Sequence, residues 1–154
     1  MNVLAIGAHP DDVEIACSGT LAKCVKRGDK VIVCHASTGN LGHVVIPPDE
    51  LTKIRAEEAK KAGGLAGIEV IGGMFDDLNI FDGNKAARDK LVDVIKYAQP
   101  DFIITHNPDD YMPDHTAVSR LVFDASFAAT LPNYKSRYEK AAALVPIYYM
   151  DTLA

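Results

Sequence analysis

The sequence predicts an α/β fold in which helices cover both faces of a doubly wound, mostly parallel sheet. Short apolar segments alternate with longer segments whose apolar residues recur at helical spacing, which is the pattern of strand–helix–strand units. The length of 154 residues and the apolar content of 48% suit one globular domain over 1–154. A polar cluster directly follows the first apolar segment, and the carboxyl ends of strands are where such sheets bind ligands.

The first half of the chain contains three predicted strands and two predicted helices. Val3-Leu4-Ala5-Ile6 is an apolar run typical of a strand buried on both faces, which places the first strand at 2–8. Helical spacing of apolar residues and the C-cap signal Gly28-Asp29 place a helix at 12–27. The next expected elements are a strand at 30–35, a long loop at 36–48, a helix at 49–62 ended by Gly63-Gly64, and a strand at 68–71.

The second half continues the same alternation after a loop rich in Gly and Asp at 72–83. The expected elements are a helix at 84–98 stopped by Pro100, a strand at 101–105, a polar loop at 106–113, a helix at 114–129 and a strand at 144–150. Right-handed crossovers between parallel strands favour the common strand order 3-2-1-4-5. In that order the first and fourth strands are neighbours.

Composition and charge argue against several functions. The net charge is −5 and Lys and Arg are scattered, so no nucleic-acid partner is expected. No apolar run approaches the ~18 residues of a membrane span, and no signal peptide opens the chain. Cys17, Cys24 and Cys34 fall inside predicted elements and are expected to be buried thiols of a cytoplasmic protein. Neither G-x-G-x-x-G nor a P-loop follows the first strand, so no nucleotide is expected there.

Two polar clusters are expected to meet at the carboxyl edge of the sheet. His9-Pro10-Asp11-Asp12 follows the first strand, and Pro113-Asp114-His115 follows the fourth. Because these strands are neighbours in the predicted order, His9, Asp12 and His115 are expected to converge on one point. Two imidazoles and one carboxylate leave an open position on a tetrahedral ion, which is typical of a catalytic zinc site. Ferrous iron suits the same donors.

Other polar residues near these clusters are interpreted as follows. Asp11 is predicted to be the general base that takes a proton from water and returns it to a leaving amine. Asp114 is predicted to accept a hydrogen bond from a ligand imidazole. For three residues two interpretations stay open. Glu14 either supports the metal ligands or is an ordinary carboxylate in the first turn of its helix, and His106 either orients a metal ligand or only ends its strand. His43 either contacts the substrate or metal or has no role beyond its loop. His35 and Asp109-Asp110 are interpreted as loop and turn residues outside the site.

The segment from Ala8 to Glu14, A-H-P-D-D-x-E, resembles the signature of the PIG-L/LmbE-like family of zinc-dependent N-acetylglucosaminyl deacetylases. Pro113-Asp114-His115 resembles the second motif of that family, and Ile54 to Ala59 resembles its R-x-E-E helix. The resemblance implies a Rossmann-like fold, a zinc ion, and amide hydrolysis on an N-acylated amino sugar. It also implies roles for matching residues, with His9, Asp12 and His115 as ligands, Asp11 as the base, and Arg55 as a contact to the sugar.

Met112 departs from the second motif of the family, which is commonly H-P-D-H and whose first His helps to stabilise the oxyanion. A Met side chain donates no hydrogen bond, and loss of one oxyanion donor typically costs ~10²–10³ in rate. Three interpretations stay open: His106 or His43 supplies the donor, Tyr111 supplies it, or the chemistry is impaired or different. Family members also usually run further, so a chain shortened at its C-terminus relative to the family is expected.

The sequence therefore predicts a metal-dependent hydrolase that removes an acetyl group from an N-acetylglucosamine-type sugar by attack of water on the amide. The alternative is a non-catalytic or impaired module that binds metal or sugar, suggested by Met112. A metallo-phosphoesterase is disfavoured because the chain is acidic and has no basic phosphate clamp. The expected partner is a small amino-sugar substrate. Asp76-Asp77 either binds the hydroxyl groups of the sugar or forms a solvated turn. The exposed loops at the carboxyl edge of the sheet also suit a homo-oligomer.

Overall fold

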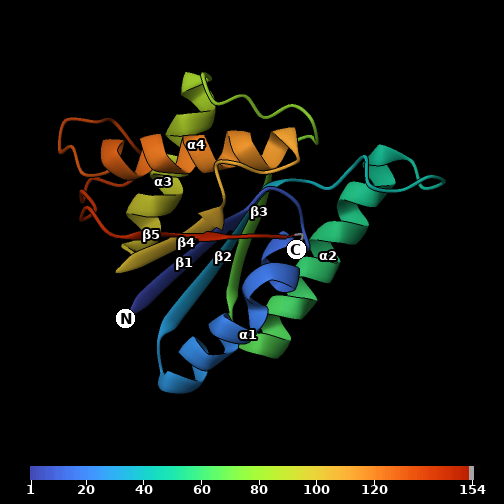
Figure 1. Ribbon diagram of the computed structural model, residues 1–154, viewed down its shortest axis with the longest axis horizontal. Coiled ribbons are helices and arrows are strands. Elements are labelled where there is room, and N and C mark those ends of the chain that lie inside the picture. Colours follow the sequence, from blue (N-terminus) through green and yellow to red (C-terminus); the bar gives the residue numbers. More distant parts are fainter. Residues whose placement is uncertain (153–154) are drawn as a thin grey trace.

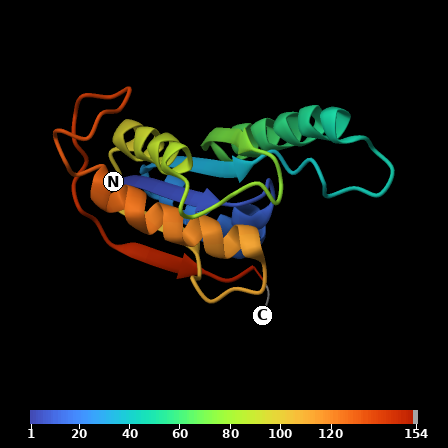
Figure 2. The ribbon, with the colours of Figure 1, turned by 90° about the horizontal axis from the view of Figure 1, so that it is seen from above.

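The computed structural model describes residues 1–152 as a five-stranded sheet between two layers of helices (Figures 1 and 2). The strand order is β3-β2-β1-β4-β5, and every neighbouring pair is parallel, as predicted. The strands are β1 (Asn2–Gly7), β2 (Lys30–Ser37), β3 (Glu69–Phe75), β4 (Phe102–His106) and β5 (Ile147–Met150). The helices are α1 (Asp12–Arg27), α2 (Pro48–Ala66), α3 (Lys85–Ala98) and α4 (Pro113–Ala128).

Each face of the sheet has its own apolar core. One core joins α3 and α4 to the side chains of Leu4, Ile32 and Ile103. The other joins α1 to the alternate side chains of the same strands, including Val3 and Val33. Because the central strands are buried on both faces, they are continuously apolar rather than alternating, which confirms how the first apolar run was interpreted.

The predicted end of the second helix at Gly63-Gly64 is wrong. The helix continues to Ala66 and ends at Gly67, which has a left-handed φ of 69° and closes the C-terminus. Gly63 lies inside the helix because α2 packs closely on β3, and a Cβ at this position would collide with the side chain of Val70. This glycine therefore reports a close approach of helix and sheet rather than a chain break.

The predicted boundaries of two strands also need correction. β3 continues through Gly72 to Phe75, whereas a loop was predicted from residue 72. A Cβ on Gly72 would lie 3.1 Å from the carbonyl oxygen of His35, which is closer than an ordinary contact, so a glycine suits this position in the paired strand. β5 is shorter than predicted and covers only Ile147–Met150 of the expected 144–150. The remaining boundaries agree with the predicted ones within two residues.

The three cysteines are free and buried, as predicted. Burial raises the pKa of Cys34 to about 12, so its thiol stays protonated and packs as a small apolar side chain. No helix among residues 1–152 is long and apolar enough to cross a membrane.

The helix α3 begins at a side-chain cap. Asn84 accepts hydrogen bonds through Oδ1 from the backbone N–H groups of Ala86, at 2.9 Å, and Ala87, at 3.3 Å. We expect Asn84→Ala to lower the free energy of unfolding by about 1 kcal/mol, because two N–H groups of the first turn lose their acceptor. Urea denaturation measures the change. Asn84→Ser keeps a capping oxygen and should lose clearly less, and equal losses in both variants would contradict a capping role.

Candidate metal centre

Two segments distant in sequence meet at the carboxyl edge of the sheet. β1 pairs directly with β4, with Ile6 opposite Thr105, so the loops that follow these strands open at the same end. His9 and Asp12 lie where β1 turns into α1, and His115 lies in the first turn of α4. One ligand atom from each of these three residues lies within 4.8 Å of the other two. Their convergence was expected from the strand order alone.

The two imidazole rings have the same arrangement around Asp12. Nδ1 of His9 and Nε2 of His115 each lie 3.4 Å from Oδ2 of Asp12. Nε2 of His115 is buried and has no hydrogen-bond partner among residues 1–152. A buried nitrogen without a partner is costly, and a cation between the two rings and the carboxylate would satisfy it. The donor set of two nitrogens and one oxygen fits a divalent transition metal.

The outer nitrogen of each ring is held by a second carboxylate. Nε2 of His9 lies 3.0 Å from Oδ2 of Asp114, and Nδ1 of His115 lies 3.0 Å from Oδ1 of Asp110. Such contacts fix the tautomer and orientation of an imidazole and direct its other nitrogen toward a metal. Asp114 also accepts a hydrogen bond from the backbone N–H of Leu78, at 2.8 Å. Both ring planes are therefore set before any ion binds.

Asp110 was not identified from the sequence, where it was interpreted as a plain turn residue. Its side chain is only 6% exposed, and it accepts a hydrogen bond from the backbone N–H of Met112, at 3.0 Å, as well as contacting His115. The signal that was missed is a carboxylate placed five residues before a candidate ligand, in a short loop between Pro108 and Pro113. A loop of this length turns the carboxylate back onto the first turn of the following helix.

His106 lies beneath the cluster and does not reach its opening. Its side chain is 0% exposed, and its Nε2 accepts a hydrogen bond from the backbone N–H of Ala8, at 2.9 Å. The same nitrogen lies 3.1 Å from Oδ2 of Asp12, and the ring stacks on that of His115 with centroids 3.9 Å apart. Of the two interpretations left open by the sequence, its position corresponds to a residue that supports Asp12 and His115.

Asp11 and Arg55 share one side of the cluster. The carboxylate of Asp11 is 49% exposed, and Nη2 of Arg55 donates to its Oδ2 at 2.7 Å. The same guanidinium donates to the carbonyl oxygen of Pro10, which joins the middle of α2 to the turn after β1. Asp11, Arg55, His9, Asp12 and His115 all line one cavity of about 440 Å³.

Asp77 also lines this cavity, but it is not part of a solvated turn. It is buried, and its two oxygens accept hydrogen bonds from the backbone N–H groups of Gly39 and Leu41, each at 2.9 Å. Asp76 accepts a hydrogen bond from the side chain of Asn40, at 3.1 Å. The pair therefore anchors the loop after β2 to the loop after β3 and shapes the wall of the cavity.

The structure does not bring Glu14 and His43 to the cluster. Glu14 lies 3.2 Å from Nε2 of His35, which is buried in β2, where the predicted strand at 30–35 places it. His43 is exposed, and its Nδ1 accepts hydrogen bonds from the backbone N–H groups of Val45 and Ile46 in its own loop. Neither residue lines the cavity that contains the cluster. The expectation that Glu14 supports the metal shell is thus not met by its position.

Electrostatics within the cluster favour a charged Asp12 beside a protonated His9 when no metal is bound. Burial opposes the charge on Asp12, but its close contacts with His106, His115 and His9 hold its pKa far below the usual range. Burial alone would lower the pKa of His9, but its contacts with Asp12 and Asp114 raise it from 6.5 to about 9. The pKa of His115 is likewise raised by Asp12 and Asp110 against the effect of burial.

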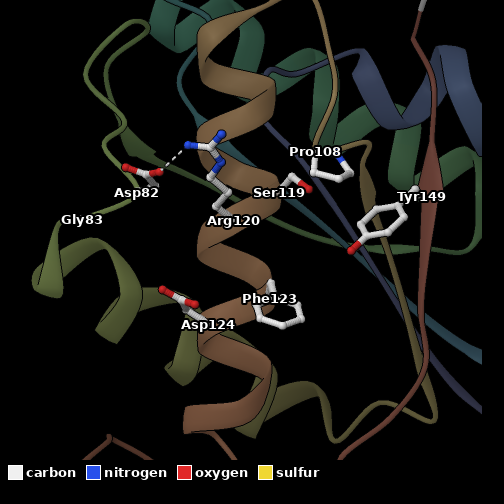
Figure 3. Close-up of a pocket in the computed structure, with 8 residues that line it drawn as sticks. All are labelled: Asp82, Gly83, Pro108, Ser119, Arg120, Phe123, Asp124 and Tyr149. Carbon is white, nitrogen blue, oxygen red and sulfur yellow. Dashed lines mark hydrogen bonds and ion pairs between the residues drawn. The ribbon is translucent and has the colours of Figure 1, made fainter.

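Another cavity of about 500 Å³ lies between α4 and β5 (Figure 3). Phe123 and Tyr149 face this space from the two elements, and Arg120 pairs with Asp82 at its edge, at 3.0 Å. Its lining residues include no His or Cys and none of the residues of the cluster. The cavity that contains His9 and His115 is therefore the candidate site.

Comparison with known proteins finds one family model and relatives with two kinds of enzyme name, deacetylase and hydratase. A family model described as "PIG-L: GlcNAc-PI de-N-acetylase" matches residues 4–126. The 4-oxalmesaconate hydratase of Pseudomonas putida is 26% identical over 97% of this chain and 60% of its own length. A 1D-myo-inositol 2-acetamido-2-deoxy-alpha-D-glucopyranoside deacetylase of Corynebacterium diphtheriae is 31% identical over 73% of this chain and 47% of its own length.

Among solved structures, the N,N'-diacetylchitobiose deacetylase of Pyrococcus horikoshii superimposes with a TM-score of 0.79. It is 27% identical to this chain, and the match covers 86% of this chain and 51% of that protein. The chain thus spans about half to three fifths of the length of these relatives.

Proposed function

Because the chain belongs to the PIG-L family, we propose that it is a metal-dependent hydrolase that removes an acetyl group from an N-acetylated amino sugar. The observation that carries this proposal is the convergence of His9, Asp12 and His115, with Asp11 on the same cavity. The relatives from Corynebacterium and Pyrococcus are deacetylases by name and support the reaction class. The remaining details follow from the residues around the cavity.

His9, Asp12 and His115 would hold the ion, which we propose to be Zn²⁺, with Fe²⁺ suited to the same donors. When bound, such an ion polarises an amide carbonyl and lowers the pKa of water from 15.7 to about 7. Asp114 and Asp110 keep the two rings directed toward it, since each contacts the outer nitrogen of one ring at 3.0 Å.

Asp11 is the proposed general base. It borders the cavity beside Asp12, and its exposed carboxylate is free to take a proton from the attacking water. After the amide bond breaks, the same carboxyl group returns that proton to the amine of the sugar. Arg55 orients Asp11 through the contact at 2.7 Å, and its guanidinium borders the cavity where sugar hydroxyls would lie.

The oxyanion that forms as water attacks needs a hydrogen-bond donor in place of Met112. Of the three donors considered from the sequence, His106 is enclosed and His43 lies outside the cavity. Tyr111 lines the cavity beside Met112, with its ring edge-on to His115 and the centroids 5.6 Å apart. We therefore assign the missing donor to the hydroxyl of Tyr111.

Elemental analysis combined with acetate release tests the proposed function. Purified protein should contain about one divalent ion per chain, and removal of the ion should abolish acetate release from N-acetylglucosamine or chitobiose. Re-addition of Zn²⁺ or Fe²⁺ then identifies which ion restores turnover. A protein that binds no divalent ion would contradict the proposal at its first step.

Two other functions need separate consideration. The non-catalytic alternative suggested by Met112 is not favoured, because the matched relatives are enzymes by name. Addition of water to an unsaturated carboxylate is a second candidate, since the hydratase of Pseudomonas putida matches 97% of this chain. Incubation with an enol or enoate diacid, followed by loss of ultraviolet absorbance, distinguishes this activity from acetate release.

We also propose that the enzyme is cytoplasmic and acts on a small substrate. Light scattering of the purified protein measures whether it associates with itself.

Metal binding should depend strongly on pH. Below about pH 9 the metal-free protein carries a proton on His9, and that proton must leave before the nitrogen can bind an ion. We expect the apparent affinity for Zn²⁺ to rise at least about tenfold per pH unit from pH 6.5 toward 9 and then to level off. Chelator competition at several pH values measures this slope.

The same proton affects the stability of the metal-free protein. The pKa of His9 is higher in the folded protein than in the unfolded chain, so the proton on His9 stabilises the fold, fully below about pH 6.5. This stabilisation is lost as the pH rises to about 9. Asp114→Asn removes a carboxylate beside His9 and should lower its pKa. The pH at which Zn²⁺ affinity levels off and the pH at which this stabilisation is lost should then both be lower. A Zn²⁺ affinity that is flat across this range would show that His9 is not a ligand.

A further inference from the structure

The cavity that contains the candidate metal ligands also has an apolar rim. Four large apolar side chains line this cavity, and each is more than half exposed: Ile15, Leu41, Leu78 and Tyr111. They come from the first turn of α1 and from the loops that follow β2, β3 and β4, so four separate segments contribute to the rim. Single exposed apolar residues are ordinary on a protein surface, but a group of them around one cavity is typical of a binding surface.

Leu78 has a backbone conformation that leucine rarely adopts. Its φ is 59°, in the left-handed region, where a leucine side chain costs free energy. The backbone N–H of Leu78 donates to Oδ2 of Asp114, at 2.8 Å, and this hydrogen bond holds the conformation. The same oxygen lies 3.0 Å from Nε2 of His9, so one carboxylate positions both a candidate ligand and a leucine of the rim. Because the side chain of Leu78 is exposed, its burial does not offset the strain, which indicates a role in binding rather than in the fold.

Leu41 is held in a similar way by the residue that precedes Leu78. Asp77 is buried, and its Oδ2 accepts a hydrogen bond from the backbone N–H of Leu41, at 2.9 Å. Buried carboxylates therefore hold both leucines through their main chains, while the two side chains stay exposed. An apolar surface that is fixed in advance binds a ligand without the cost of ordering a mobile loop.

The rim does not suit the polar parts of the proposed substrate. Sugar hydroxyls need hydrogen-bond partners, and burial against leucine and isoleucine leaves them without any. The methyl of an acetyl group is too small to cover four large side chains. An anionic group is disfavoured as well, because three carboxylates line the cavity: Asp11, Asp12 and Asp77. Arg55 also lines it, but its guanidinium is already paired with Asp11 and Glu58. An uncharged hydrocarbon group bonded to the sugar fits these observations.

We propose that the rim binds an apolar aglycone, so that the substrate is an N-acetylated amino sugar whose anomeric oxygen carries an aryl ring or a short alkyl chain. This inference rests on the proposed function, because it assigns the other half of the same substrate. The metal ligands and Asp11 act on the acetamide, whereas the rim holds the group at the anomeric position. Leu41 and Leu78 are its specificity-determining residues, and Ile15 and the ring of Tyr111 complete the surface.

Three amino-sugar compounds test which group the rim binds, with release of the free amine as the measurement. The methyl glycoside of N-acetylglucosamine has no large apolar group, the benzyl glycoside carries one on the anomeric oxygen, and the methyl glycoside of N-phenylacetylglucosamine carries one on the acyl group. Both anomers of each are compared. We expect kcat/KM to be at least about tenfold higher for the benzyl glycoside than for either other compound. Equal values, or a preference for the phenylacetyl compound, would overturn the rim assignment and leave amide hydrolysis intact.

Two variants remove apolar surface from the rim. Leu78→Asn and Leu41→Asn should each lower the ratio of kcat/KM between the benzyl and methyl glycosides at least about threefold. Asn adopts the left-handed conformation more readily than Leu, so position 78 tolerates this change. Leu65→Asn is the matched control, because Leu65 is an exposed leucine of α2 outside the cavity, and it should keep the parent ratio. An unchanged ratio in Leu78→Asn would overturn the proposal.

A binding measurement separates the rim from the reaction. Benzyl and methyl glucosaminide carry no acetyl group, so they bind without being hydrolysed. In two-dimensional NMR of the purified protein, the amides of Leu41 and Leu78 should shift saturably, with an affinity for the benzyl compound at least about tenfold higher. If these shifts occur but no acetamide is hydrolysed, the proposed function fails while the apolar binding surface is supported. Equal affinities for the two compounds would overturn the rim assignment whatever the enzyme hydrolyses.

Discussion

Asp11→Asn is expected to lower kcat/KM for acetate release by about 10²–10⁴ while the metal content stays at the parent value. The substitution keeps the size of the side chain and removes only its ability to accept a proton. Asp11 contacts Arg55 but none of the three candidate ligands through its side chain, so the metal cluster should be undisturbed. The measurement pairs steady-state kinetics with elemental analysis of the same sample.

Two controls make this result specific. Asp109→Asn alters an exposed carboxylate in the neighbouring loop and should leave turnover within about twofold, as expected for a surface position. Arg55→Lys keeps the positive charge but loses the double contact to Asp11 and Pro10, so it should reduce kcat less than Asp11→Asn does. If Asp11→Asn retained full turnover with metal bound, another group would have to be the base.

The sheet and the meeting of the two polar clusters were predictable because both follow from rules that act over the whole chain. Apolar runs such as Val3 to Ile6 mark strands buried on both faces, and a parallel sheet in the order 3-2-1-4-5 places β1 beside β4. Once that neighbourhood is given, His9 and His115 must lie at the same edge. Their separation of about a hundred residues in sequence is no obstacle.

The errors concern glycines and carboxylates whose role depends on a neighbour in space. Glycines are common in loops, but Gly63 lies where the sheet leaves no room for a Cβ, and Gly72 lies where a Cβ would be tight against the neighbouring strand. Asp110 was interpreted as a turn residue because nothing in its own segment shows that the loop folds back onto His115. For Glu14 the sequence left two interpretations open, and the structure places its carboxylate beside His35 rather than at the metal cluster.

The assignment of Tyr111 as oxyanion donor predicts a second large effect. Tyr111→Phe removes one hydroxyl from the cavity and keeps the ring that lies edge-on to His115. We expect kcat to fall by about 10²–10³, which is the usual loss for one oxyanion donor, with KM and metal content much less affected. Acetate release under saturating substrate measures the change.

Substitution of Met112 tests whether the fall in kcat of Tyr111→Phe comes from the loss of a hydrogen bond to the oxyanion. Met112→His introduces a hydrogen-bond donor at the position where the family motif has one. When it is added to Tyr111→Phe, it should raise kcat at least about tenfold above that of Tyr111→Phe alone. In the parent protein the same change should raise kcat by less than about tenfold, because the oxyanion already has a donor there. The two effects are therefore non-additive if both side chains serve the same oxygen. A large gain from Met112→His in the parent, together with no loss in Tyr111→Phe, would mean that the natural chain lacks an oxyanion donor and that Tyr111 only borders the cavity.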